Sequence, residues 1–248
     1  TVTSISDNGN AVVGSKPTDL LHVMFTRNKT HVQLRQVNTD YITGSTQIDE
    51  ALRKSTLGAI ISNQKIQAYN NDSTAIVFDM TGVFLSDNKK MSPFDRNSIY
   101  GMYNRTENYQ SDCSYISQIK AFKDNVSIKS CLSYTFSVSN SQGASLIKDR
   151  PFTAEMTRSI MLLKEKPYRP RMADYRIGVF FTGREQLGEG AKTTAPVYYA
   201  NRWDIQPSDT AAYLRGEKVK PTKQIVFYID NTFPEKWKPY LREGVTQW

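Results

Sequence analysis

YISQIKAFKDNVSIKSCLSYTFSV, residues 115–138, is the stretch of sequence that decides the fold class. Two runs rich in β-branched and aromatic residues, 115–122 and 126–138, are separated by Lys-Asp-Asn at 123–125. Asp and Asn suit a tight turn because both residues tolerate positive φ angles. The stretch therefore predicts two antiparallel strands joined by a short hairpin turn.

Similar strand patterns recur on both sides of this hairpin. Apolar and polar residues alternate in HVQLRQV (31–37), and they alternate again at the start of the run 152–163, which is typical of half-buried strands. Further strand-like runs lie at 20–25, 66–70, 74–80, 179–181, 196–205 and 224–230. The best helix candidate in the N-terminal half is 45–63. The sequence therefore predicts a mainly β or α+β fold, with antiparallel sheets in a sandwich- or barrel-like arrangement and few helices.

Polar segments without a clear period separate these runs. Residues 1–20 are rich in Ser, Asn and Gly, and they predict a flexible lead-in to a β-rich domain at 21–205. Residues 86–112 predict a long surface excursion, and residues 139–150 predict a polar break. Residues 206–223 are polar with two prolines and predict a linker.

The last segment, 224–248, predicts a strand followed by a helix. A buried strand is expected at 225–229. Apolar residues then recur at helical spacing: Trp237, Leu241, Val245 and Trp248. Pro239 predicts a loose first turn or a late helix start, because proline cannot donate a helical hydrogen bond. The apolar face of this helix is expected to pack against further protein; the alternative is a C-terminal helix docked on the sheet.

Charge and cysteine content narrow the functional classes. The net charge is +8, but the Lys and Arg residues are scattered, so a nucleic-acid interface is not expected. No apolar run is long enough to predict a transmembrane segment. Cys113 and Cys131 have no CxxC partner and no neighbouring His, so we expect either one disulfide or two buried thiols rather than a zinc site.

Motifs of hydrolytic chemistry do not occur in the sequence. The two histidines, His22 and His31, stand in strand patterns and outside any H-E-x-x-H motif. G-x-S-x-G and the glycine-rich phosphate-binding motifs do not occur either. We therefore predict no catalytic, cofactor-binding or metal-binding residue in this chain.

A basic segment, KPYRPRMADYR (166–176), carries a different kind of signal. Arg169, Arg171, Asp174 and Arg176 stand close together between prolines and an aromatic strand. Guanidinium groups on an extended segment suit bidentate pairing with carboxylates of a neighbouring surface. The alternative is an ion-pair loop that is satisfied within the domain.

Several of these segments together resemble a family of secreted bacterial zinc-dependent metalloproteases of metzincin-like type, common in Bacteroidetes. The resemblance runs over most of the chain and is carried by residues 66–87, 114–130, 152–181, 198–209 and 225–248. The family usually reads D-P-R-x-G where this chain has D-Y-R-I-G (174–178). It usually reads T-R-W/H where this chain has A-N-R-W (200–203), so Arg202 and Trp203 join the candidate interdomain contacts.

The resemblance implies that this chain is the non-catalytic part of a longer protein with a separate catalytic domain. The H-E-x-x-H motif of the family lies beyond this stretch, so 224–248 resembles the first strand and helix of a catalytic domain that is cut off before the zinc site. Zinc is then expected in the full-length parent, which would be secreted, periplasmic or attached to the outer membrane.

Three functions follow as expectations. The first is a non-catalytic accessory or pro-like region that supports, orients or shields the downstream catalytic domain, or that helps to capture a protein substrate. The second is a β-rich peptide- or glycan-binding module of the cell envelope. The third is a hydrolase with an unrecognised site.

Overall fold

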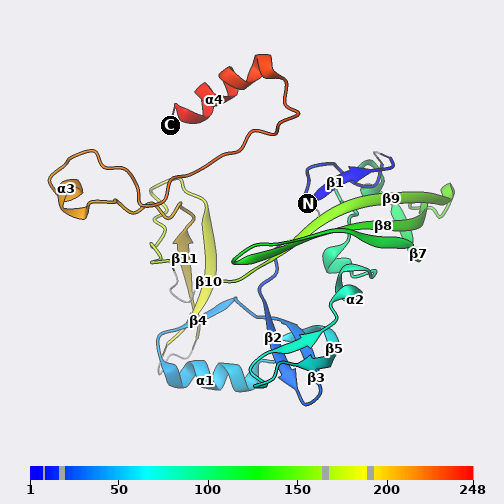
Figure 1. The fold of residues 1–248 in the computed structure, drawn as a ribbon, viewed down its shortest axis with the longest axis horizontal. Coiled ribbons are helices and arrows are strands. Elements are labelled where there is room, and N and C mark those ends of the chain that lie inside the picture. Colours follow the sequence, from blue (N-terminus) through cyan, green and yellow to red (C-terminus); the bar gives the residue numbers. More distant parts are fainter. Residues whose placement is uncertain (8, 17–19, 164–167, 189–192, 248) are drawn as a thin grey trace. The chain divides into compact units, whose positions relative to one another are not determined.

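The computed structural model describes residues 1–7, 9–16, 20–163, 168–188 and 193–247 (Figure 1). The chain divides into two compact units. Unit 1 comprises Thr1–Pro167 and Gly183–Val197, and unit 2 comprises Tyr168–Thr182 and Tyr198–Trp248. Strands dominate, most pairs are antiparallel and helices are few, which confirms the predicted fold class.

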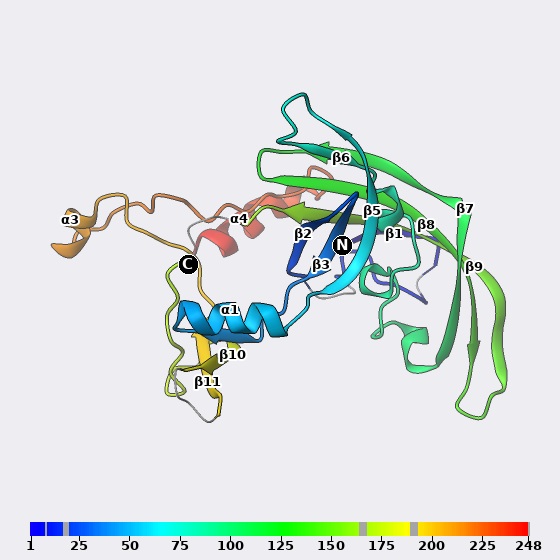
Figure 2. The ribbon, with the colours of Figure 1, turned by 90° about the horizontal axis from the view of Figure 1, so that it is seen from below.

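The largest sheet of unit 1 is built around the predicted hairpin. Its order is β1 (Val2–Ile5), β9 (Ser145–Met161), β8 (Asn125–Ser139) and β7 (Asn104–Ala121). The three long strands curve into a half-barrel (Figure 2). The Phe122 N–H donates to the Asn125 carbonyl over 2.8 Å, which closes the hairpin at the predicted position. Neither Asp124 nor Asn125 adopts a positive φ angle, so the tolerance that suggested the turn is not used.

Alternation along β8 builds the main core. Its even-numbered residues from Ile128 to Val138 are buried, while most of the odd-numbered ones are partly exposed. Phe94 packs against this face, with its ring 4.8 Å from the Tyr134 ring and 5.1 Å from the Phe152 ring. The strand predicted at 126–138 is therefore confirmed, and its period of two defines the inward face.

The described residues 1–7 and 9–16 are not a lead-in, and the prediction of a flexible segment there is wrong. β1 pairs antiparallel with β9, Val2 faces Met156, and Val2 is completely buried in the main core together with Ala11. The Ser-, Asn- and Gly-rich composition gave no signal for a short edge strand. The partner of this strand, β9, lies about 150 positions further along the chain. Residues 8 and 17–19 lie outside the described part of the chain.

The predicted surface excursion at 86–112 is also wrong. The segment follows α2 (Thr81–Phe84) and contains two short 3₁₀ helices, η1 (Lys89–Met91) and η2 (Ile99–Met102), before β7 begins at Asn104. Phe94 lies between them and is buried in the main core. The predicted break at 139–150 is likewise shorter, because β9 already begins at Ser145.

A second antiparallel sheet has the order β2 (Val23–Asn28), β3 (His31–Gln36), β5 (Ala59–Tyr69) and β6 (Ile76–Phe78). The helix predicted at 45–63 is confirmed only in its first half, as α1 (Thr46–Ser55). Residues 59–63 instead start β5, which pairs with β3. Gly58 permits this change, because an added Cβ there would lie 2.6 Å from the Gln36 carbonyl oxygen.

A third sheet has the order β11 (Ala195–Ala200), β10 (Phe181–Leu187) and β4 (Tyr41–Thr43). β10 and β4 run parallel, with Glu185 opposite Tyr41, which departs from the antiparallel pairing that the sequence predicted. The boundary between the two units falls within β10 and β11.

The C-terminal part of unit 2 contains α3 (Thr210–Leu214), η3 (Glu235–Trp237) and α4 (Lys238–Thr246). The predicted helix is confirmed, and it starts late with Pro239 in its first turn. The strand predicted at 225–229 is wrong: the segment forms no strand pairing within the described residues, and the side chains of residues 225–228 are exposed. Trp248 lies outside the described residues. None of the described helices is long and apolar enough to cross a membrane.

Tyr134 makes the stability of the core depend on pH in the alkaline range. Its side chain is 2% exposed, and its hydroxyl has no hydrogen-bond partner within the described residues. Burial, and then the negative charge of Asp87, raise its pKa far above the ordinary value of about 10. The unfolded chain ionises this phenol from about pH 10 upward while the folded chain cannot, so stability is lost as pH rises.

We expect Tyr134→Phe to remove that loss. The free energy of unfolding of the wild type should fall by up to about 1.4 kcal/mol per pH unit above pH 10 from this group alone. At pH 7 the variant should be within about 1 kcal/mol of the wild type, because the deleted hydroxyl makes no hydrogen bond. Urea denaturation at pH 7, 10 and 11 measures both values. Tyr213→Phe is the control, since that side chain is exposed. Equal pH slopes for wild type and Tyr134→Phe would contradict the assignment.

Candidate functional site

An open pocket of about 610 Å³ lies within unit 2 and gathers three of the predicted contact residues. Arg169, Arg171 and Arg202 line it beside Gln206 and Tyr213. Apolar side chains complete the wall: Pro170, Ile205, Pro207, Val219 and Pro221. We call this site the arginine pocket. No Asp or Glu stands among the lining residues that the structure describes.

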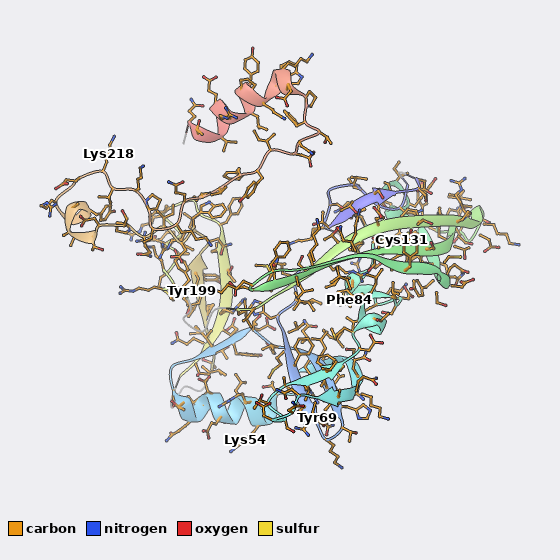
Figure 3. The ribbon with its side chains drawn as sticks, in the orientation of Figure 1. Lys54, Tyr69, Phe84, Cys131, Tyr199 and Lys218 are labelled. Atoms are coloured by element: carbon orange, nitrogen blue, oxygen red, sulfur yellow. The ribbon has the colours of Figure 1, made fainter. Side chains whose placement is uncertain are left out.

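The first wall of the arginine pocket is the basic segment that follows Tyr168. The Ala173 N–H donates to the Tyr198 carbonyl over 2.8 Å, and the Ala200 N–H donates to the Arg171 carbonyl over 2.9 Å. A bridge between Met172 and Tyr199, the latter labelled in Figure 3, lies between these two bonds. This pairing with the end of β11 holds the segment extended, as its prolines predicted. Residues 166 and 167 of the predicted segment lie outside the described part of the chain.

Arg202 is held in place by its neighbours. Its Nη2 donates to the Arg169 carbonyl oxygen over 3.1 Å, and its guanidinium lies over the Tyr168 ring, 4.4 Å from the ring centroid. The Tyr168 hydroxyl in turn donates to the Trp203 carbonyl oxygen over 3.1 Å. A cation over a tyrosine face with one backbone hydrogen bond is pre-oriented, so less side-chain entropy is lost when it binds an anion.

Arg169 and Arg171 differ from Arg202 in having no partner of their own. Within the described residues, neither side chain makes a hydrogen bond or an ion pair. An arginine without a counter-charge keeps its planar fork of N–H donors available for a bidentate acceptor. These two guanidinium groups are therefore the part of the pocket that is ready for a ligand.

The second wall is the segment 206–223, which the sequence predicted as a linker. It is an ordered loop whose ends are joined: the Ser208 N–H donates to the Lys220 carbonyl over 2.9 Å, and the Thr222 N–H donates to the Gln206 carbonyl over 2.8 Å. A bridge between Pro207 and Pro221 lies at the same neck. Figure 3 labels Lys218 in this loop. The linker prediction is corrected, because both ends of the segment bond to each other.

Helix α3 shapes the interior of this loop. The Asp209 Oδ1 accepts a hydrogen bond of 2.9 Å from the Ala212 N–H and caps the helix start. Gly216 adopts φ = +85°, and its N–H donates to the Tyr213 carbonyl, which ends the helix. The helix carries Tyr213, and the chain after it carries Val219 and Pro221, into the pocket wall.

The other predicted contact residues lie outside the arginine pocket. Asp174 and Arg176 satisfy each other in a bidentate pair, with Nε 2.9 Å from Oδ1 and Nη2 2.5 Å from Oδ2. The Arg176 guanidinium lowers the pKa of the Asp174 carboxyl, and the carboxylate raises the pKa of Arg176. The ion-pair alternative therefore holds for this pair. Trp203 is 63% exposed and does not line the pocket.

The cysteines and potential metal ligands contribute nothing to this site. Both thiols are free; Cys131 is buried on β8 and Cys113 is exposed on β7, so neither the disulfide nor the pair of buried thiols is found. Among the described residues, no group of three or more His, Cys, Asp or Glu side chains could hold a metal ion.

The arrangement is suited to binding an anion beside an apolar group. Guanidinium forks match carboxylate and phosphate geometry, and the proline, isoleucine and valine side chains offer apolar surface next to them. These lining residues therefore favour recognition of an anionic group.

Sequence reasoning missed the residues that the 206–223 loop contributes. A signal for α3 was present, because Asp209 precedes a short run of helix formers and Gly216 follows it. The two prolines suggested a linker and hid that pattern. The convergence of this loop on the arginine segment has no signature in the sequence.

Comparison with curated proteins and with solved structures gave no match. The family model of a domain of unknown function, DUF5117, matches residues 14–208, which include the three arginines of the pocket. Because that match covers well over half of the chain, the protein belongs to the DUF5117 family of domains of unknown function.

Proposed function

We propose that this chain is a non-catalytic accessory region that binds a carboxylate-bearing polypeptide surface through the arginine pocket. The observation that supports this is the group of three guanidinium groups in one pocket without an acidic lining residue. In the parent protein we assign the surface to a downstream zinc-dependent metallopeptidase domain. That assignment rests on the resemblance of the sequence to the metalloprotease family, as does an extracytoplasmic location.

Electrostatics favour an acidic partner. Arg169, Arg171 and Arg202 are exposed, and no acidic residue among the described lining residues offsets their charge within the pocket. The net charge of the chain, +8, has the same sign. A carboxylate in the pocket would form charge-assisted hydrogen bonds with these guanidinium groups, partly screened by the surrounding water.

The accessory role separates into support and shielding. A supporting contact predicts that losing it destabilises the downstream domain, while a shielding contact predicts that losing it raises peptidase activity. Zinc would be held by the downstream domain, since the described residues of this chain supply no ligand group for it.

We expect Arg169→Ala plus Arg171→Ala to weaken binding to the downstream domain by about 10- to 100-fold. The variant removes the two unpartnered forks, and each charge-assisted hydrogen bond contributes about 1.5–3 kcal/mol. Calorimetric titration of the chain with the separately produced downstream domain, at low and high salt, measures the change. In the full-length parent, the same variant should alter either the melting temperature or the peptidase rate.

The matched control is Arg53→Ala plus Arg150→Ala, which removes the same charge from exposed positions in unit 1. This control should bind like the wild type at moderate salt. If the pocket variant bound equally well and left both activity and stability of the parent unchanged, the proposal would fail.

A peptide-binding module is the second candidate, and the same pocket supports it over a glycan-binding module. Neutral sugars present no group that would offset three guanidinium charges. An acidic peptide would bind the chain with the same dependence on Arg169 and Arg171, while the downstream domain would show no affinity. The two titrations therefore distinguish the two candidates.

A further inference from the structure

A second recess lies in unit 1, far from the arginine pocket along the sequence, and it has the opposite character. It is an apolar groove of about 430 Å³, a volume within the usual range of small-molecule sites. Its lining includes Phe25, Phe78, Phe84, Ile119, Ile128 and Ile160. Phe25 and Ile119 are largely exposed there, with Ile119 62% exposed. The one acidic lining residue, Asp79, is engaged, since its Oδ1 accepts from the Thr81 N–H over 2.7 Å.

Arg158 does not line the groove itself, but it adjoins two of the residues that do. It is on β9, opposite Ile128 on β8 and two residues before Ile160, so all three side chains share one face of the sheet. Its guanidinium lies 5.4 Å from the centroid of the Phe84 ring, and Figure 3 labels Phe84. The Nη2 donates to the Phe84 carbonyl oxygen over 2.6 Å.

The remaining donors of Arg158 have no acceptor. Its Nε and Nη1 are buried and make no hydrogen bond within the described residues, and no carboxylate there pairs with the group. Ser130, on the same face, is fully buried, and its hydroxyl is also without a partner. Burial lowers the pKa of Arg158, as expected for a cation without a counter-charge.

A buried and unpaired guanidinium is costly, since charges in protein interiors are normally paired and hydrogen-bonded. The acceptor that best satisfies two adjacent N–H donors is a carboxylate. Apolar surface adjoins Arg158, because Ile128 and Ile160 line the groove and share its face of the sheet. A ligand that fills the apolar groove and also accepts from the Arg158 donors must have an apolar body and one anionic end.

We infer that the groove binds a long-chain carboxylic acid, with the hydrocarbon tail along Phe25, Ile119 and Ile160 and the carboxylate on Arg158. Phe84 lines the groove and its ring also lies against the Arg158 guanidinium, so the inference requires the Phe84 side chain to move aside as the carboxylate enters. The inference is independent of the arginine pocket and of the proposed accessory role, because every residue it uses lies in unit 1.

The test titrates the 248-residue chain with decanoate and with decyltrimethylammonium, which share a tail length and carry opposite charges. Decanoate should bind with one site per chain and at least about 10-fold more tightly, as expected from one charge-assisted contact. Equal affinity for the two amphiphiles, or no saturable binding of decanoate, would overturn the inference.

Two variants locate the site. Ile119→Glu places a carboxylate at an exposed groove position and should weaken decanoate binding by at least about 10-fold without unfolding the chain. Arg158→Met should weaken decanoate by a similar factor and leave decyltrimethylammonium unchanged. If Arg158→Met does not fold, Ile119→Glu and the comparison of head groups decide the outcome.

Two controls exclude other sites. Leu146→Glu makes the same kind of change at an exposed β9 position outside the groove and should bind like the wild type. Arg169→Ala plus Arg171→Ala should also retain decanoate binding. Loss of binding in that double variant would place the carboxylate in the arginine pocket and would overturn the inference while leaving the proposed function intact.

Discussion

Replacing Phe136 by alanine is expected to destabilise unit 1 by about 3–5 kcal/mol, the usual cost of deleting a buried phenylalanine ring. Phe136 is completely buried at the inner face of β8. Its ring lies 5.7 Å from the Tyr100 ring and 6.4 Å from the Phe152 ring. The surrounding groups come from η2, β8 and β9, so a cavity there cannot close by moving a single side chain.

Urea denaturation followed by circular dichroism measures this loss. Because the chain has two compact units, the transition that contains unit 1 must be identified first. All three tryptophans, Trp203, Trp237 and Trp248, belong to unit 2, so tryptophan fluorescence identifies the transition of unit 2 and the other transition is that of unit 1. Phe136→Leu, which keeps most of the volume, should cost only about 1–2 kcal/mol. Phe122→Ala removes the same ring at an exposed turn and should change stability by less than about 0.5 kcal/mol. Similar losses for Phe136→Ala and Phe122→Ala would contradict the assigned core.

The strands that the sequence predicted best are those in which local pattern and pairing agree. β8 has six buried even-numbered positions from Ile128 to Val138, and its partner β7 precedes it in the same hairpin, so the periodic signal and the contact are both local. The predictions for residues 1–20 and 86–112 were wrong for the opposite reason. Their polar composition is genuine, and only single side chains such as Val2 and Phe94 enter the core. A hydrophobic pattern averaged over a window of sequence does not reveal such isolated buried side chains.

Residues 225–229 show the opposite error, in which a strong strand pattern does not form a strand. Five consecutive apolar or aromatic residues predict a buried strand, but a strand needs a neighbour with free backbone groups. No described strand pairs with this segment, and the side chains of residues 225–228 remain exposed. Composition therefore predicts the tendency to form a strand, and pairing decides the outcome.

The sequence predicted which residue types form the candidate site, but it did not predict how they are arranged. The spacing of Arg169 and Arg171 between prolines indicated an extended, donor-rich segment, and Arg202 was added by resemblance alone. Which arginines would be free depended on contacts that the sequence does not encode locally. Asp174 pairs with Arg176 two positions away, while Arg169 and Arg171 face a loop that begins 35 residues beyond Arg171.

Introducing a charge at Val2 is expected to have the second large effect, because Val2 is the residue through which the N-terminus enters the core. Val2 is 0% exposed and belongs to the main core with Leu132, Phe152 and Ala154. The Val2 N–H donates to the Ser15 carbonyl over 3.0 Å, and the Gly14 N–H donates to the Val2 carbonyl over 2.9 Å. The backbone on both sides therefore holds the side chain in place, and an aspartate there cannot turn toward solvent without breaking β1.

Val2→Asp should lower the free energy of unfolding by at least about 3–5 kcal/mol, the cost of leaving an uncompensated charge in the interior. The alternative for the mutant is to release residues 1–6 from β9, which loses the burial of Val2 and exposes amide hydrogens of β9 to exchange. Hydrogen exchange at residues 154–157 and urea denaturation measure the two routes together. Val12→Asp makes the same change at an exposed position of the same segment and should leave both measurements near wild type. A wild-type stability for Val2→Asp with unchanged exchange would show that the N-terminal segment is the flexible lead-in that its composition suggests.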